Sequence, residues 1–281
     1  MVDKKYILER WTQKLLANPV TKIGIKQTDL NVLKNKPDLT VFLYNTHGWT
    51  NWQRGQSEFE KWLKKGEYKK HREENYRFEK NNINAVYNKL KINGTVLDVG
   101  GSVGTLREFL HEKVKYICID PDPDPMASVN VEKLNVYQCL KKPLNFVRAC
   151  AEFLPFKQES FDYVHMRSML DHVQIPDLAI IEANRVLKKN GCLVIGIYLP
   201  NGKSTKPSIR LVIKEAIRSF LVFLGFKSFK DHHIWHPTYT SLLKLLNDNE
   251  FSIINEIWQE GWDNKVLYLS AKKVEMNDKE Y

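Results

Sequence analysis

Histidines and carboxylates gather at two places in the second half of the chain. Asp171 and His172 stand side by side, and a second group contains His232, His233 and His236. An imidazole titrates near neutral pH and can accept the proton of an attacking hydroxyl group, so either group is a candidate general base. The same residue types bind divalent metals. Neighbouring histidines usually point in opposite directions, however, so a metal stays possible and is not predicted, and a structural cluster is the alternative.

A glycine-rich turn lies upstream of both groups, in the stretch VLDVGGSVGTL. A short apolar run ends at Asp98, and the turn then passes through Gly100, Gly101, Ser102 and Gly104. Glycine lets backbone N–H groups approach a ligand that lies across the turn, because no side chain intervenes. The pattern predicts a buried strand, a ligand-binding turn and the start of a helix, although several nucleotide-binding folds share it.

A second apolar run, VKYICI, ends directly before Asp120. An acidic residue at the tip of the second strand is well placed to accept hydrogen bonds from a ribose diol. Because Pro121 leaves the end of this strand uncertain, Asp122 is the alternative acceptor. The two strands therefore predict a nucleotide-like ligand at their carboxyl ends.

Three further motifs follow in order: Ala151-Glu152 before LPF, the run SFDYV from Ser160, and the run RVLK from Arg185. In this order and spacing, the chain from about residue 82 to residue 273 resembles the class I S-adenosylmethionine-dependent methyltransferases, in their broad small-molecule branch. The resemblance implies an α/β, Rossmann-like fold, in which a doubly wound, mostly parallel seven-stranded sheet carries helices on both faces. It also implies an enzyme with S-adenosyl-L-methionine as its cofactor.

The resemblance implies a cofactor site around the glycine turn and the strand ends beside it. Asp98 and the turn would hold the methionine part and the sugar, and Asp120 would bind the ribose hydroxyls. The complete implied set is Asp98, Gly100, Gly101, Ser102, Gly104, Asp120, Pro121, Ala151, Glu152, Met166, Arg167 and Ser168. Two residues depart from the family pattern: Ser102 replaces a glycine, and Cys150 replaces an aspartate that relatives often carry.

The elements that position these residues alternate along the chain. Strands are expected at 95–99, 114–119, 144–148, 163–166, 193–198, from 252, and at 265–270, and helices at 104–112, 176–187 and 241–247. Such alternation predicts a parallel sheet with a ligand outside the carboxyl ends of its strands. We divide the chain into a mainly helical N-terminal extension or lid (1–81), a methyltransferase domain (82–273) with a helical insertion at 201–240, and a disordered tail (274–281).

Composition limits the functional classes. The chain has 281 residues, 43% of them hydrophobic, and a formal net charge of +10, which fits an anionic partner or plain solubility. Its four cysteines lack a CxxC spacing, which favours buried reduced thiols over a metal site. No apolar run reaches the ~20 residues of a membrane span, and the charged N-terminus does not fit a signal peptide. A cytoplasmic location is therefore expected.

The insertion contains a basic and strongly apolar segment at 208–226, SIRLVIKEAIRSFLVFLGF. This pattern is typical of a helix that covers a substrate site, packs in a dimer or lies on a membrane surface. Peripheral membrane contact is therefore one of three open alternatives, and the protein is expected to be a monomer or a homodimer.

The leading hypothesis is O-methylation of a small molecule or glycan, such as a free, nucleotide-linked or lipid-linked sugar, with a histidine as general base. The catalytic candidates are His172, Asp171, His232, His233 and His236. The alternatives are a natural-product or lipid head-group N- or O-methyltransferase and a noncatalytic methyltransferase-like regulatory partner. Nucleic acid is not expected as a partner, because no RNA-binding module or Asn/Asp-Pro-Pro-Tyr/Phe motif follows the fourth strand.

Overall fold

The computed structural model describes residues 72–121, 129–173, 175–204, 233, 235–259 and 265–274, together with scattered positions between 209 and 225. In chain order these residues form α3 (Glu73–Leu90), β1 (Thr95–Val99), η2 (Thr105–Phe109), β2 (Lys115–Asp120), α4 (Val131–Val136), η4 (Gln138–Lys141), β3 (Phe146–Arg148), β4 (Phe161–Arg167), α5 (Pro176–Val186), β5 (Leu187–Tyr198), α7 (Tyr239–Asp248), β6 (Phe251–Trp258) and β7 (Val266–Lys273). The elements η2 and η4 are 3-10 helices. Strands and helices alternate over most of this length, as expected for an α/β fold.

Seven strands form one sheet in the order β3-β2-β1-β4-β5-β7-β6. The strands β1 to β5 pair in parallel, whereas β7 lies antiparallel between β5 and β6. The chain begins in the middle with β1, moves outward to β3, and returns to β4 on the other side of β1. In open α/β sheets, ligands bind outside the carboxyl ends of the strands at such a reversal. The expected doubly wound, mostly parallel sheet is confirmed, and the reversal in strand order at β1, where such folds form a crevice, lies beside the glycine turn.

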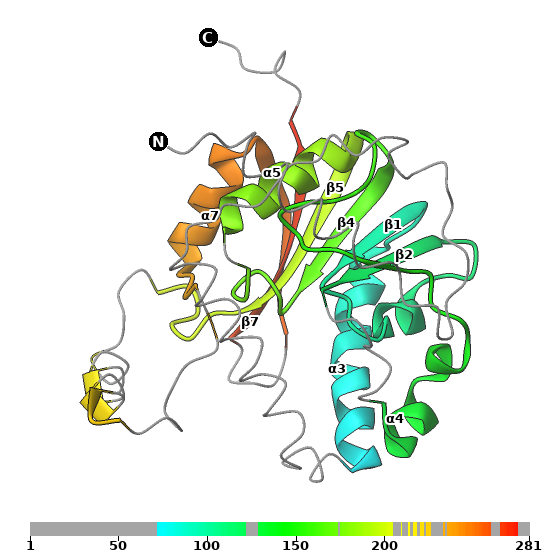
Figure 1. Ribbon diagram of the computed structural model, residues 1–281, viewed down its shortest axis with the longest axis horizontal. Coiled ribbons are helices and arrows are strands. Elements are labelled where there is room, and N and C mark those ends of the chain that lie inside the picture. The colour runs from blue at the N-terminus through cyan, green and yellow to red at the C-terminus, as the bar shows by residue number, and fades with distance from the viewer. Residues whose placement is uncertain are drawn as a thin grey trace.

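Helices cover both faces of this sheet, with α5 and α7 on one face and α3 on the other (Figure 1). Leu97 of β1 belongs to the same buried cluster as Ile180 of α5 and Leu242 of α7. Its neighbour Val96 packs instead with Ile83 of α3. Successive side chains of a strand point to opposite faces, so consecutive residues of β1 serve two separate cores. α4 packs beside α3.

Most of the expected elements differ from the observed ones by one to three residues at an end, and two of them differ in kind or in length. The helix expected at 104–112 is only the short 3-10 helix η2, because Gly104 begins it in a left-handed conformation and Leu110 ends it in an extended one. The strand expected at 193–198 begins earlier, at Leu187, because β5 continues along β4 through a shift in register. The first crossover therefore contains fewer helical residues than the pattern predicts, and the sheet contains more strand residues.

The predicted domain boundaries stay predictions. The extension at 1–81 lies outside the described residues up to residue 71, and its boundary with the next domain falls within α3. Tyr76 and Tyr87 of α3 are buried, whereas Phe78 is 63% exposed. Of the tail at 274–281, only Val274 is described.

The insertion is helical at the described positions between 209 and 223 (yellow in Figure 1). Six of its apolar side chains are more than half exposed to solvent; one is Leu224, and the five in the helix are Ile209, Ile213, Ile217, Phe220 and Phe223. Their spacing of three and four residues places them on one face of the helix, which we call the insertion face. Among the described helices, none combines the length and the hydropathy that a bilayer crossing requires.

Candidate functional site

The glycine turn connects β1 to η2 and rests on the neighbouring strand β2. The N–H groups of Gly100 and Gly101 donate to the carbonyl oxygen of Ile119, over 2.8 and 3.2 Å. Gly101 has no room for a side chain, because a Cβ there would lie 2.5 Å from Asp98 Oδ2. Ser102 adopts a φ of +48°, the left-handed conformation that glycine takes most easily. The serine therefore keeps the backbone path expected of a glycine at this position.

Asp98 lies beneath the turn and is buried. Its Oδ1 lies 2.7 Å from His165 Nδ1 on β4, and its Oδ2 accepts a hydrogen bond from the Tyr116 hydroxyl on β2. Burial raises the pKa of the Tyr116 phenol well above its usual range, and the Asp98 charge raises it further, so the phenol remains a donor. Tyr87 of α3 contacts the other ring nitrogen of His165 at 2.7 Å. Asp98 thus ties three adjacent strands together under the turn.

Asp120 and Pro121 end β2 at the side of the turn. Asp120 Oδ2 accepts a hydrogen bond from the Ser102 N–H over 3.0 Å, so a carboxylate lies directly beside the bare backbone. The carbonyl oxygen of Pro121 accepts from Arg148 Nε over 3.1 Å. The alternative acceptor, Asp122, lies outside the described residues. A carboxylate at this strand end fits a ligand that carries a diol.

Ala151 and Glu152 follow β3 and are both buried. Glu152 Oε1 accepts a hydrogen bond from the Ile175 N–H over 3.3 Å, which links the segment after β3 to the start of α5. Cys150 is buried as well, and burial raises the pKa of its thiol well above the usual range. A neutral thiol therefore stands where the resemblance implied an aspartate.

The three residues at the end of β4 point in different directions. Met166 is buried in the core beneath α5 and α7, whereas Arg167 Nη2 donates to Glu79 Oε1 of α3 over 2.9 Å. Ser168 is exposed at the carboxyl edge, and its N–H donates to the Gly196 carbonyl oxygen over 2.7 Å. Met166 can therefore face the crevice only through its backbone.

The segment that follows β4 lies directly against the glycine turn. A Cβ on Gly100 would lie 2.6 Å from the Cβ of Met169, and the N–H of His172 donates to the Met169 carbonyl oxygen over 2.9 Å. The N–H of Trp235, which precedes α7, donates to the Asp171 carbonyl oxygen over 3.1 Å. This bond attaches the second histidine group to the first.

Asp171, His172 and His233 meet at this point, and we call them the mouth cluster. His233 Nε2 lies 3.6 Å from Asp171 Oδ2, and His172 Nε2 lies 3.9 Å from Asp171 Oδ1. The imidazole centroids of the two histidines are 4.7 Å apart. The ring of His236 is 6.0 Å from that of His233, and His232 lies outside the described residues. The structure thus brings together three of the five predicted catalytic candidates, and these three come from both histidine groups.

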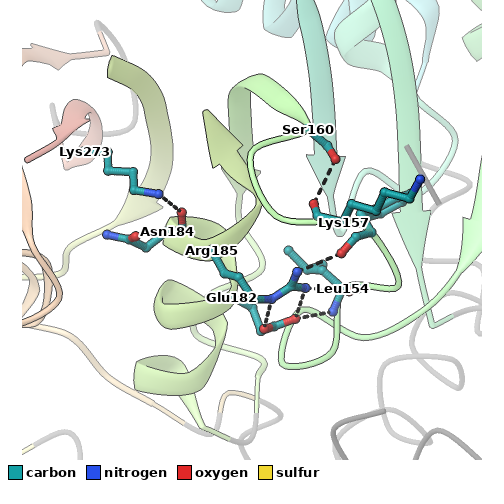
Figure 2. A network of polar contacts seen from close by, with 8 residues as sticks. Leu154, Lys157, Ser160, Glu182, Asn184, Arg185 and Lys273 are labelled. Carbon is teal, nitrogen blue, oxygen red and sulfur yellow. Dashed lines mark hydrogen bonds and ion pairs between the residues drawn. The ribbon is translucent and has the colours of Figure 1, made fainter. Parts of the chain in front are cut away.

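A buried network supports the segment between β3 and β4 (Figure 2). The Arg185 guanidinium bonds both carboxylate oxygens of Glu182, over 2.6 and 2.8 Å, and donates to the carbonyl oxygens of Leu154 and Phe156 over 2.8 and 2.7 Å. Glu182 also accepts from the Leu154 N–H over 2.9 Å. The LPF and RVLK motifs therefore serve one structural purpose, which is to fix the loop that follows Ala151-Glu152.

Sequence reasoning missed the pair of Asp98 with His165, although Asp98 was predicted to belong to the site. The two residues stand opposite each other in the register of β1 and β4. A polar residue in the middle of each of two apolar strands was the available signal, because such residues need partners when buried. The register that pairs them depends on the fold and cannot be predicted from the sequence of either strand alone.

Comparisons with known proteins find similarity to methyltransferases, in agreement with a glycine turn and a carboxylate at neighbouring strand ends. Residues 97–195 match the family model described as a methyltransferase domain. An uncharacterized methyltransferase of Mycobacterium tuberculosis is 32% identical over 112 residues, which are 40% of this chain and 42% of that protein. A ubiquinone/menaquinone biosynthesis C-methyltransferase of Francisella tularensis is 29% identical over 169 residues, or 56% of this chain and 66% of that protein. The chain spans less than half the length of the first curated relatives that it matches.

Solved structures show the same fold at lower identity. The 1,6-didemethyltoxoflavin N1-methyltransferase of Burkholderia thailandensis, solved with its substrate and S-adenosylhomocysteine, is 16% identical with a TM-score of 0.53, covering 86% of this chain and 94% of that one. A Thermotoga maritima protein described as a possible histamine N-methyltransferase is 19% identical with a TM-score of 0.50, covering 81% and 100%.

Proposed function

We propose that this chain, whose residues 97–195 form a methyltransferase domain of the class I S-adenosylmethionine-dependent kind, transfers a methyl group to a hydroxyl oxygen of a small molecule or glycan. The observation that carries the proposal is the mouth cluster, which lies against the glycine turn through Met169. A hydroxyl oxygen becomes a good nucleophile only as its proton leaves, and histidines at the crevice are the side chains suited to take it.

The residues around the turn fit S-adenosyl-L-methionine. This cofactor, when bound, supplies a methyl group made electrophilic by its sulfonium. The Asp120 carboxylate beside the turn suits two ribose hydroxyls, which are donors. The turn from Gly100 to Gly104 would lie against the methionine part through atoms other than the N–H groups of Gly100, Gly101 and Ser102, which already donate to Ile119 and Asp120. Ser168 and the backbone of Met166 border the same edge. Asp98 contributes by holding the turn in place from below.

Methyl transfer then needs one proton acceptor on the side of the substrate. The acceptor oxygen would form a bond to the methyl carbon as the carbon–sulfur bond breaks with its electron pair on sulfur, and the hydroxyl proton would pass to a histidine. His172, His233 and His236 lie near one another and are the candidates for this role, and Asp171 lies 3.9 and 3.6 Å from the first two.

Two measurements test this proposal together. Titration calorimetry is expected to show binding of S-adenosylmethionine and S-adenosylhomocysteine, and a labelled methyl donor is expected to mark sugars or other hydroxyl compounds. His236→Gln should lower turnover by about 100-fold or more with little change in cofactor affinity, whereas His111→Gln, at an exposed position, should change neither. Label found on nitrogen or carbon would show that the methyl acceptor is that atom and not a hydroxyl oxygen. Absence of cofactor binding would favour a noncatalytic regulatory partner.

The insertion face favours an acceptor that is carried at a membrane surface. Its exposed isoleucines and phenylalanines are flanked by a strongly basic sequence. Residues 203–230 contain a single acidic residue, Glu215, against seven basic ones, namely Lys203, Lys206, Arg210, Lys214, Arg218, Lys227 and Lys230. An apolar face with basic flanks matches the acyl boundary and the headgroups of an anionic lipid surface. A lipid-linked sugar would be presented at such a surface.

The protein is therefore expected to sediment with vesicles that contain anionic lipid and to be released by salt. The double variant Phe220→Ser/Phe223→Ser should abolish this sedimentation. Phe78→Ser is the control for an exposed phenylalanine, because Phe78 is 63% exposed, close to the 60% of Phe220, but lies on α3. Equal sedimentation of all three proteins would exclude the insertion face as the membrane contact and leave a lid or a dimer contact.

A further inference from the structure

The atoms of the mouth cluster are spaced for ligands of one ion and not for direct hydrogen bonds. The distances of 3.6 and 3.9 Å between Asp171 and the two imidazole nitrogens exceed the roughly 2.7–3.2 Å of an N–H···O hydrogen bond. One ligand atom from each of Asp171, His172 and His233 lies within 4.8 Å of the others. Ligands at about 2.0–2.2 Å from one tetrahedral ion are about 3.3–3.6 Å apart, so a small contraction would complete the geometry.

The carboxylate of Asp171 gives a second, independent indication. Its side chain is only 13% exposed, and its Oδ1 is buried without a hydrogen-bond donor. Buried polar atoms in native proteins nearly always have a partner. A cation held between Oδ1, Oδ2 and the two imidazoles would satisfy this oxygen and would also explain why two histidine rings face one carboxylate at this spacing.

We propose that Asp171, His172 and His233 bind a divalent first-row transition metal. Two imidazole nitrogens with one carboxylate oxygen suit Zn²⁺ and its neighbours, whereas Mg²⁺ and Ca²⁺ prefer oxygen ligands alone. Three protein ligands are typical of sites that keep a coordination position for water or substrate. The backbone bond from Trp235 to Asp171 holds the segment that carries His233 against the one that carries His172.

This inference rests on the proposed function and assigns roles within it. The acceptor hydroxyl would occupy the remaining coordination position, where a divalent metal makes the oxygen easier to deprotonate. His172 and His233 would then serve as ligands. His236, whose ring lies 6.0 Å from that of His233 and outside the ligand set, takes the proton.

Metal binding is tested with the metal alone, on the full chain dialysed against a chelator. Zn²⁺ calorimetry is expected to give one ion per chain, and Co²⁺ is expected to show the visible absorption of a four-coordinate site. Asp171→Asn, His172→Gln and His233→Gln should each weaken Zn²⁺ binding about 100-fold or more. His111→Gln is the matched control for a surface histidine and should leave it unchanged. Zn²⁺ should also raise the Tm of the original protein but not that of Asp171→Asn.

Zn²⁺ binding that these three variants leave intact would overturn the site, as would the absence of binding by the folded protein. Asp171→Asn keeps the shape of the side chain and the two Gln variants keep a polar one, and each variant is checked by thermal unfolding and by titration with S-adenosylmethionine. Cofactor binding without Zn²⁺ binding would remove the metal and leave the proposed function intact. Zn²⁺ binding without cofactor binding would retain the metal site and contradict the proposed methyl transfer.

Discussion

Glu182→Ala is expected to lower the free energy of unfolding by about 3 kcal/mol, near the lower end of the range for breaking a buried ion pair. Glu182 is 4% exposed and bonds both the Arg185 guanidinium and the Leu154 N–H. Its removal leaves a largely buried positive charge and a buried amide without their acceptor. The lower end applies because Arg185 is 25% exposed and keeps two carbonyl acceptors.

Urea unfolding at pH 7 measures this effect. Asp248→Ala is the matched control, since it removes an exposed acid–base pair with Lys244 and should change stability by no more than a few tenths of a kcal/mol. The double variant Glu182→Ala/Arg185→Ala distinguishes a network from a simple pair. If only charge pairing mattered, removing both partners would recover most of the loss. Because the pair also satisfies backbone groups of Leu154 and Phe156, we expect no such recovery. Recovery would contradict this interpretation.

Asp120→Ala is expected to weaken binding of S-adenosylmethionine by about 10- to 100-fold. A hydrogen bond to a charged group contributes about 1.5–3 kcal/mol, and 1.4 kcal/mol corresponds to a factor of ten. The variant also removes the acceptor of the Ser102 N–H, which loosens the turn on which the cofactor would lie. Calorimetric titration of the folded variant measures the change.

Two further variants sharpen this experiment. Asp120→Asn keeps one oxygen acceptor without the charge, so its affinity should fall between those of Asp120→Ala and the original protein. Asp122→Ala tests the neighbouring carboxylate and should leave affinity unchanged. An unchanged affinity in Asp120→Ala, together with a loss in Asp122→Ala, would transfer the ribose contact to Asp122.

The central strands and the glycine turn were predictable because local pattern alone specifies them. The strand expected at 95–99 has these bounds in the structure, since a β-branched and aliphatic run stops at a glycine turn there. The first helix was predicted too long. Apolar spacing continues to Leu110, but the left-handed Gly104 and the extended Leu110 limit the chain to η2.

The sequence motifs name candidate site residues but do not show which of their side chains are buried. Asp98 and Met166 were placed on the same site by motif, yet they point to opposite faces of the sheet and neither side chain is exposed. The mouth cluster, too, could be predicted only in part from the sequence. Asp171 and His172 are neighbours in sequence, whereas His233 joins them only because the segment before α7 folds back onto the end of β4. Such contacts depend on how distant elements pack.

The position of β7 has a consequence for biosynthesis. One edge of β5 pairs with β7, which follows it in the chain only after the insertion, α7 and β6. On the ribosome, the first five strands can assemble while that apolar edge of β5 still lacks its neighbour. An unpaired edge is a template for strands of other chains. Because the entropy of loop closure grows only slowly with length, a longer insertion would cost little stability but would lengthen the period in which nascent chains can aggregate.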